Sequence, residues 1–470
     1  MDSVDLNRLF PTKRADFSED EVFDIAVVGA GVVGCAIFKE FCEQGAKTVL
    51  IEKANDILDG ASKGNSAILH TGFDAPPNTL ELECIKRGYE EYLRVKDDLG
   101  LPFHNAKALV IAWSDEQLEK LDAIMQKGLG NGINELKMLN KKEVHKKEPN
   151  LAKTLKGAIL VEGESLIDPW SAPLAYVKKG VKCGGKLAFS HEVIGGEYKG
   201  EYWELQTSQN KIRAKVVINA AGLYGDIVEQ ISGNIDFKII PRKGQFLIFD
   251  KSATPLINSI ILPVPTKRTK GVVITRTAFG NILVGPTAED QESRTDSSTV
   301  KETLLMLKEK AFAMLPKLQH YKVTATFAGL RPASEQSHYR VDINKDKNWI
   351  TVGGIRSTGL TSALGLAKYV FELNNKSYTP SPNKDAKITM PNISEFAPRE
   401  HTKGGYKKIV CHCECVTNKE IKDACSGDVS AGNIDGLKRR TRVMMGRCQG
   451  FNCEAAVAKI VKDEVAKNEE

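Results

Sequence analysis

The sequence predicts a mixed α/β and α+β protein: a Rossmann-like dinucleotide-binding domain, an inserted and mainly antiparallel β domain, and a small helical cysteine module. Three observations support this prediction. An apolar strand near the start leads into a glycine-rich turn and a helix, short segments of alternating hydrophobicity fill the middle, and four cysteines gather near the end. Parallel βαβ units and antiparallel β segments in one chain indicate two different sheets.

The composition is that of a globular protein with room for two or three domains, since the 470 residues are 41% hydrophobic and 27% charged. The net charge of +6 is spread among acidic residues, which disfavours nucleic-acid binding and favours a small anionic substrate. No apolar run has the length of a membrane span, and residues 1–21 lack a signal pattern. We therefore expect a cytoplasmic protein without a transmembrane segment, and contact with a membrane surface stays open.

The first βαβ unit is predicted from a strand at 23–28, a helix at 34–44 and a second strand at 47–52. The turn between the first strand and the helix reads Gly29, Ala30, Gly31, Val32, Val33 and Gly34. Glycine at its first position permits a tight turn, the second lets the backbone approach a pyrophosphate, and the third allows close packing of helix on strand. Glu52 ends the second strand, where it can accept the ribose hydroxyls.

Later segments return to the same sheet and also build a second one. Apolar strands are expected at 215–219, before Ala220, Ala221 and Gly222, and at 349–354. β-like segments at 244–249, 260–264, 271–276 and 281–284, with a helix at 300–314, suggest an inserted substrate domain. A change of composition after residue 375, rich in Pro, Ser and Lys, predicts a linker.

These segments divide the chain into four parts. We expect an N-terminal extension at 1–20, an oxidoreductase at 21–375, a linker at 376–407 and a metal-binding module at 408–470. Within the oxidoreductase, the dinucleotide-binding parts are 21–75, 150–235 and 325–375, and the substrate domain comprises 76–149 and 236–324.

The glycine-rich fingerprint, together with residues 61–66, 219–226 and 353–361, resembles the D-amino-acid oxidase superfamily of flavoproteins. The resemblance spans residues 22 to about 375 and implies FAD as the cofactor. Besides the fingerprint and Glu52, it implies cofactor contacts from Lys53, Ser62, Asn65, Ser66, Ala220, Ala221, Gly222, Gly354, Gly359, Leu360 and Thr361.

Within that superfamily, the sequence is most similar to type II glycerol-3-phosphate dehydrogenases and oxidases. The similarity rests on residues 65–72, 166–169, 263–272, 283–287 and 327–332, in order and spacing. It implies that His70 removes the proton of the substrate hydroxyl, a task suited to a side chain that titrates near neutral pH. It also implies that Lys270, Arg331 and Ser357 bind the substrate, with the two cations facing a phosphate.

The metal ligands expected in the C-terminal module are Cys411 and Cys413, followed after 34 residues by Cys448 and Cys453. Four thiolates from two loops suit a 2Fe-2S cluster or a tetrahedral zinc ion. The resemblance of residues 408–465 to the bacterioferritin-associated-ferredoxin-like module favours the 2Fe-2S cluster. His412 and Cys415 are alternative ligands outside the matched pattern.

A basic run at 438–442, with Arg447, has three possible roles: it offsets the charge of the cluster, forms a solvated helix face, or docks an electron acceptor.

The sequence thus predicts FAD-dependent oxidation of sn-glycerol 3-phosphate, a small phosphorylated polyol, to dihydroxyacetone phosphate, with electrons leaving through the cluster to a one-electron or quinone-linked partner. Three alternatives stay open. They are an oxidase that produces hydrogen peroxide, a dehydrogenase of a 2-hydroxy acid such as L-2-hydroxyglutarate, and an iron-sulfur scaffold or redox sensor. The additional cysteine module distinguishes the chain from the oxidase branch and argues against oxygen as the direct acceptor.

Overall fold

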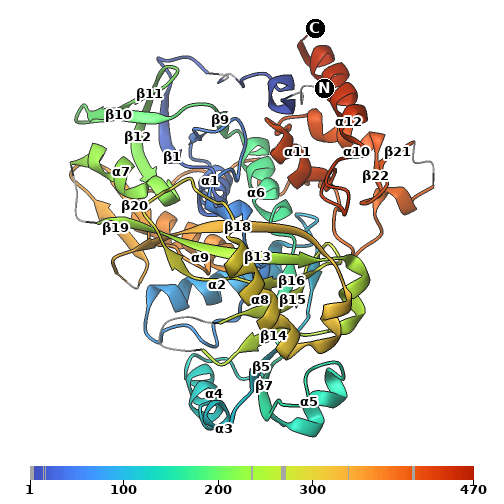
Figure 1. Ribbon diagram of the computed structural model, residues 1–470. Helices are drawn as coiled ribbons and strands as arrows, with labels where there is room; N and C mark the ends of the chain where they lie inside the picture. Colours follow the sequence, from blue (N-terminus) through green and yellow to red (C-terminus); the bar gives the residue numbers. More distant parts are fainter. Residues whose placement is uncertain are drawn as a thin grey trace.

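The computed structural model describes residues 5–13, 15, 17–233, 237–265, 271–336, 338–404 and 408–469. It contains two large sheets, one above the other in Figure 1, and a C-terminal module beside the upper sheet. This arrangement confirms the predicted mixed fold of a Rossmann-like part, a mainly antiparallel β part and a small third module.

The first sheet contains the predicted βαβ unit. Its strands run in the order β10 (Val193–Tyr198), β11 (Trp203–Thr207), β12 (Lys211–Asn219), β1 (Val22–Val28), β2 (Thr48–Ile51) and β9 (Lys186–Ala188). The C-terminal half of β12 also pairs with β20 (Trp349–Gly353), which pairs with β19 (Arg340–Asn344). The central strands are parallel and almost wholly apolar, as expected for strands that are buried on both faces.

Four helices pack against one another and the first sheet: α1 (Val32–Glu43), α2 (Leu80–Val95), α6 (Ser171–Lys182) and α9 (Gly359–Asn374). Glycines allow two of these helices to approach closely, because a Cβ at Gly88 of α2 would lie 2.1 Å from the carbonyl oxygen of Thr361 in α9. A short helix, α7 (Gly225–Glu229), follows β12.

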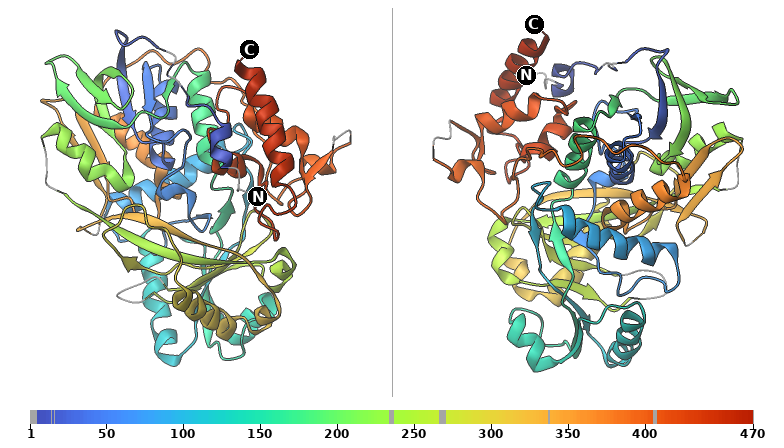
Figure 2. Two further views of the ribbon diagram at one scale, coloured as in Figure 1. Left: turned by 45° about the horizontal axis from the view of Figure 1, so that its top comes forward. Right: turned by 180° about the vertical axis from the view of Figure 1, so that it is seen from behind.

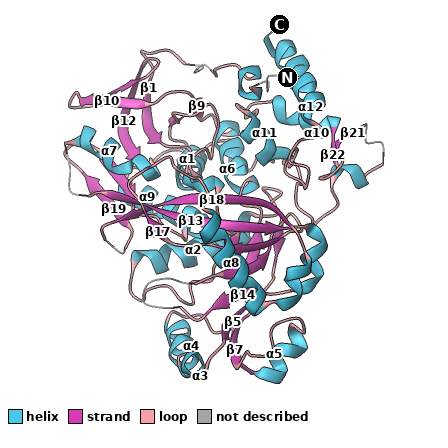
Figure 3. Cartoon of the chain, viewed as in Figure 1, coloured by secondary structure: helices cyan, strands magenta, loops and turns pink. Residues whose placement is uncertain are grey.

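The second sheet has the strand order β17 (Glu289–Asp290), β13 (Ile239–Phe249), β16 (Ile282–Gly285), β15 (Val273–Arg276), β14 (Ile260–Pro263), β5 (Ala108–Ala112), β7 (Gly157–Val161) and β6 (Leu136–Asn140). A long strand, β18 (Val323–Ser334), pairs with β13. Figure 3 shows α8 (Lys301–Met314) against this sheet and α3 (Asp115–Glu119), α4 (Leu121–Gly130) and α5 (Lys141–Lys147) at its far end.

Sheet membership moves two of the expected boundaries. β7 pairs with β5 and β6, and β18 pairs with β13, although both were assigned to dinucleotide-binding parts. Conversely, α2 was assigned to the substrate domain but packs on α9. Apolar runs are similar in both sheets, so their hydrophobicity alone does not reveal which sheet they join.

A three-stranded sheet lies between the two large ones and consists of β3 (Ile68–Leu69), β8 (Ser165–Ile167) and β4 (Phe103–His104). β8 pairs with both other strands, so residues that are about 100 positions apart in the sequence become neighbours.

The C-terminal module consists of β21 (Ile409–Cys411), β22 (Val416–Thr417), α10 (Asn418–Cys425), α11 (Ile434–Thr441) and α12 (Glu454–Glu469). The N-terminal turn Leu6–Leu9 belongs to the same core, because Leu6 and Phe10 are buried among module residues. Figure 2 shows this turn beside α12. Part of the N-terminal extension is therefore built into the module.

The segment between α9 and the module follows the surface of the first domain. Its backbone accepts hydrogen bonds from Lys179 at Ala386 and from Lys178 at Thr389, and Ile393 is buried beside Phe279. Among the described helices, none combines the length and apolar character that a bilayer span requires.

Candidate functional site

The glycine-rich turn has the geometry that its three glycines predict. Gly29 adopts a φ of 104°, and a Cβ there would lie 2.7 Å from the carbonyl oxygen of Ala220. A Cβ at Gly34 would lie 1.9 Å from the carbonyl oxygen of Gly29. Helix α1 begins at Val32 after Gly31, without a capping side chain at that residue. The turn therefore ends in a helix N-terminus whose cap residue has no side chain, which favours a bound pyrophosphate.

Glu52 is half-buried at the end of β2 and holds the glycine-rich turn. Its carboxylate accepts hydrogen bonds from the amides of Ala30 at 2.7 Å and Ala54 at 2.9 Å. Burial raises the pKa of Glu52 above its ordinary value, against the effect of these two hydrogen bonds. A half-buried carboxylate beside the turn suits the ribose contact expected of it.

The loop at 61–66 lies against the same helix end. Ser62 accepts a hydrogen bond from the amide of Val32 at 3.0 Å, and Asn65 connects the carbonyl of Ser62 to the amide of Ala67. Gly64 packs on β18, where a Cβ at Gly329 would lie 2.5 Å from the Gly64 carbonyl oxygen. These residues shape a cradle from backbone and small side chains, which fits a flavin dinucleotide.

The remaining residues expected to contact the cofactor lie after β2, β12 and β20, in the first turn of α1, and before β3. Ala220 donates its amide to Val28, Lys53 places its ammonium 3.4 Å from the ring centroid of Tyr224, and Gly222 and Gly354 have φ values of 54° and 68°. Ala221 follows β12, Val33 lies in the first turn of α1, and Ser66 is half-buried just before β3.

His70 follows β3 and is paired with a carboxylate that the sequence reasoning missed. Its Nδ1 lies 2.8 Å from Oε2 of Glu164, which is fully buried immediately before β8. The other carboxylate oxygen of Glu164 accepts from the amide and hydroxyl of Thr71. With Nδ1 occupied in this way, Nε2 is the ring nitrogen left for a substrate proton.

The start of α9 supports His70 from the other side. Thr361 accepts a hydrogen bond from the amide of His70 at 3.0 Å and donates to the carbonyl of Ile68. The side chain of Thr361 thus anchors β3, while Gly359 and Leu360 open a helix without a capping side chain. Such a helix start can stabilise negative charge nearby.

Arg331 lies on β18, and its guanidinium lies against Gly244 of β13. It lies between Gly329, which packs on Gly64, and Ser334, which approaches Gly354. Its Nη2 donates to the carbonyl of Thr287 at 2.9 Å. Burial, with Arg242 opposite, lowers the pKa of Arg331 to about 10, so the guanidinium stays charged at neutral pH.

Ser357 and Lys270 are the other two residues expected to bind the substrate. Ser357 is exposed on the loop between β20 and α9. Lys270 lies outside the described residues.

The four cysteines expected to bind the cluster meet in two pairs, Cys413 with Cys448 and Cys411 with Cys453. Burial raises the pKa of Cys453 to about 12, whereas backbone donors led by Asn452 lower that of Cys448. Over the described residues, no three His, Cys, Asp or Glu side chains form a group around a single ion. Two thiol pairs suit a two-iron cluster, in which each iron takes two of them. The thiol of Cys415 instead donates to the backbone carbonyl of His412. His412 itself is an exposed residue.

The basic run is mostly an internal interface. Arg440 and Asp56, on the loop after β2, form a buried two-bond ion pair with both distances 2.7 Å. Arg439 donates to the carbonyl of Ile57, and Arg442 is also buried. The solvated-face interpretation is therefore wrong for these three arginines, because they contact the rest of the protein. Lys438 and Arg447 instead form surface ion pairs, with Asp435 and Asp250.

Comparison with known proteins agrees with this geometry. Residues 24–373 match the model of FAD-dependent oxidoreductases, and residues 409–463 match that of the BFD-like [2Fe-2S] binding domain. A glycerol 3-phosphate dehydrogenase of Caloramator mitchellensis is 35% identical over 94% of this chain and 95% of its own length. A glycerol 3-phosphate oxidase of Mycoplasma pneumoniae is 30% identical over 79% of this chain and 99% of its own.

The structure of the L-alpha-glycerophosphate oxidase from M. pneumoniae, with FAD bound, superposes with a TM-score of 0.75 at 28% identity. It covers 79% of this chain and 100% of the oxidase. The chain therefore belongs to the family of FAD-dependent oxidoreductases, with FAD as its cofactor and a BFD-like 2Fe-2S domain at residues 409–463.

Proposed function

We propose that this protein oxidises sn-glycerol 3-phosphate to dihydroxyacetone phosphate and passes the electrons out through its 2Fe-2S cluster. The observation that carries the proposal is the His70 ring held by Glu164, with Arg331 on a strand that contacts the same flavin cradle. The name of the 35% identical relative supports the choice of substrate, and its match over 94% of the chain supports a role that needs the cysteine module.

In this proposal, Nε2 of His70 takes the proton of the C2 hydroxyl while Glu164 stabilises the charged ring. Arg331 binds the phosphate through its planar fork, and Lys270 and Ser357 complete the phosphate site. Bound FAD supplies the hydride acceptor. The four cysteines Cys411, Cys413, Cys448 and Cys453 hold the cluster that receives the electrons.

The direct test is an anaerobic titration of the purified protein with glycerol 3-phosphate while the visible flavin absorbance is recorded. We expect bleaching by glycerol 3-phosphate and none by L-2-hydroxyglutarate or amino acids at equal concentration. Bleaching by the hydroxy acid alone would contradict the proposed substrate.

The route of the electrons requires a second test. Cys448→Ser is expected to leave flavin reduction by substrate intact and to abolish electron transfer to a one-electron acceptor such as ferricyanide. Unchanged transfer in this variant would refute the role of the cluster.

An oxidase that delivers electrons to oxygen is the second candidate, favoured by the oxidase name of the M. pneumoniae relative. Stoichiometric hydrogen peroxide during turnover in air, unaffected by Cys448→Ser, would establish it in place of the dehydrogenase.

A further inference from the structure

Three parts of the molecule meet at the ring of Phe279, a buried residue at the tip of the hairpin between β15 and β16. The ring stacks on Trp170, which directly precedes α6, with centroids 4.8 Å apart and an interplanar angle of 16°. The guanidinium of Arg442 in the C-terminal module lies 4.2 Å from the same ring centroid. Arg442 also lies 5.9 Å from the ring centroid of Trp170, so each of the three parts contributes one planar group to a stack in which all three groups are neighbours.

One end of this stack is tied to the flavin cradle. The indole N–H of Trp170 donates to the carbonyl oxygen of Lys63 at 3.1 Å, next to Ser62 in the loop at 61–66. Asp168 fixes the turn that carries the indole, since its Oδ1 accepts from the amides of Trp170 and Ser171.

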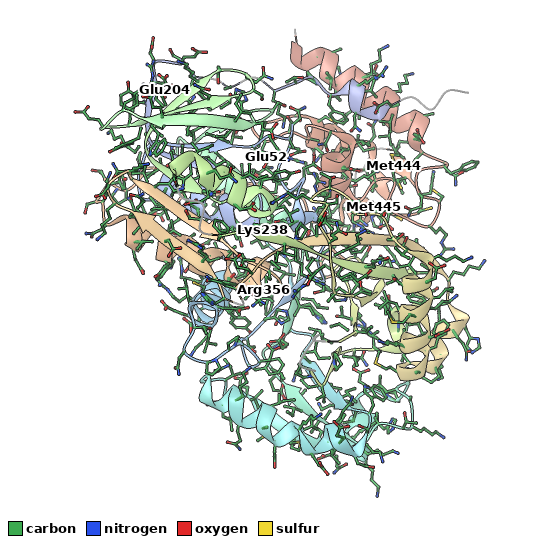
Figure 4. All side chains as sticks on the ribbon, turned by 60° about the vertical axis from the view of Figure 1, so that its left-hand side comes forward. Glu52, Glu204, Lys238, Arg356, Met444 and Met445 are labelled. Atoms are coloured by element: carbon green, nitrogen blue, oxygen red, sulfur yellow. The ribbon has the colours of Figure 1, made fainter. Side chains whose placement is uncertain are left out.

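The other end of the stack leads to the cysteine loops. Arg442 donates to Oε2 of Glu414 at 3.3 and 3.2 Å, and Glu414 directly follows Cys413. The Nη1 atom of Arg442 lies 3.8 Å from Sδ of Met445, a residue labelled in Figure 4. The next residue, Gly446, packs so closely that a Cβ there would lie 2.4 Å from that of Cys413.

Placing Arg442 where it lies costs free energy, in backbone strain and in the burial of its charge. A non-glycine residue with a φ of 71° carries a backbone strain of about 1–2 kcal/mol, and its charge is buried. The Asp56–Arg440 pair already joins the module to the first domain. A second buried arginine that stacks on two aromatic rings points to a role beyond attachment.

We infer that the stack of Trp170, Phe279 and Arg442 is the route along which electrons pass one at a time from the reduced flavin to the cluster. The inference rests on the proposed function. Each passage removes one electron from the flavin and reduces one ferric ion of the cluster to ferrous. A one-electron acceptor then reoxidises the cluster, and after two passages the flavin is oxidised and its N5 proton has gone to water.

The test measures transfer within the protein itself, in Phe279→Leu and in a matched control, Phe396→Leu. Phe396 packs on the same small cluster but stacks on His104, outside the route. The flavin is reduced by light with an amine donor, so the result does not depend on the true substrate. Appearance of the reduced-cluster electron paramagnetic resonance signal then gives the transfer rate.

We expect Phe279→Leu to slow this transfer and Phe396→Leu to leave it unchanged. The midpoint potential of the cluster, and the protection of residues 376–407 from protease, should equal those of the wild type in both variants. Wild-type transfer in Phe279→Leu, or an equal loss in both variants, would overturn the inference.

Faster proteolysis of residues 376–407 in Phe279→Leu would show that this variant loosens the module. In that case Arg442→Lys is the variant that tests the route. Lysine keeps the positive charge opposite Glu414 but has no planar face to stack. Slower transfer in this variant supports the route, and wild-type transfer overturns it. Failure of glycerol 3-phosphate to bleach the flavin would refute only the proposed substrate, because the light-driven experiment is independent of it.

Discussion

Glu164 is the side chain on which the orientation of the His70 ring depends. Glu164→Gln replaces the buried carboxylate, so the positive charge that develops on the ring loses its partner. We expect flavin reduction by glycerol 3-phosphate to slow about 100-fold in anaerobic stopped-flow experiments.

Glu162→Gln is the matched control, because Glu162 lies two residues away and forms an ion pair with Lys107. Its flavin-reduction rate should equal that of the wild type. Equal rates in all three proteins would show that Glu164 has no part in the reaction.

Arg331 offers a second test at a single side chain. Arg331→Met removes a half-buried guanidinium. We expect the binding free energy of glycerol 3-phosphate to weaken by about 2 kcal/mol, seen as a higher dissociation constant. Arg242→Met is the comparison, since Arg242 lies opposite on β13 and is held by Asp290. Equal weakening in both variants, in the same flavin titration, would deny Arg331 a specific role.

The individual site residues illustrate what a single sequence reveals. His70 and Arg331 were found through resemblance to a family, and the structure ties their strands to the flavin cradle. Glu164 was missed because 94 residues separate it from His70, and only the pairing of β3 with β8 brings them together. A glutamate between Gly163 and the first residue of a strand carries no such signal.

Among the secondary structure elements, α11 and the loop after β2 are coupled by the Asp56–Arg440 pair. Burial raises the pKa of Asp56, but the charge of Arg440, its hydrogen bonds to Asp56 and the charge of Lys13 outweigh this effect. The pKa of Asp56 therefore lies below its ordinary value. A depressed pKa means that the pair stabilises the fold above the unfolded value and loses this effect as the pH falls through the folded value.

Asp56→Asn tests this coupling because it leaves Arg440 buried without a charged partner. We expect a loss of about 3 kcal/mol in the free energy of unfolding at neutral pH, measured by denaturation. The difference from the wild type should be constant down to about pH 5 and shrink below about pH 4. Asp435→Asn on the exposed side of α11 is the control and should cost less than about 1 kcal/mol.

The elements themselves were largely predictable. The strand expected at 23–28 is Val22–Val28, and the helix expected at 300–314 is Lys301–Met314, because local patterns of hydrophobicity determine such segments. Their assignment to sheets was less accurate for β7 and β18, since strand partners are chosen by contacts that are distant in sequence. The buried arginines of α11 were missed for the same reason.

Across the whole molecule, the turn Leu6–Leu9 joins the C-terminal module to the rest of the protein. Phe10 is 8% exposed and packs in the module core. Phe10→Ala is expected to cost about 3 kcal/mol of stability and to accelerate loss of the iron-sulfur absorbance on heating. Arg8→Ala should change neither, because the Arg8 side chain is 87% exposed. An unchanged melting temperature in Phe10→Ala would contradict a structural role for the turn.

The packing of residues 6–10 against α12 also constrains how the protein is made. A ribosome releases that segment more than 400 residues before its partner helix is synthesised. During this interval the oxidoreductase domain can fold as a unit, since domains generally do so in the order of their synthesis. The domain that binds the cluster is therefore complete only after all of the FAD-dependent part has left the ribosome.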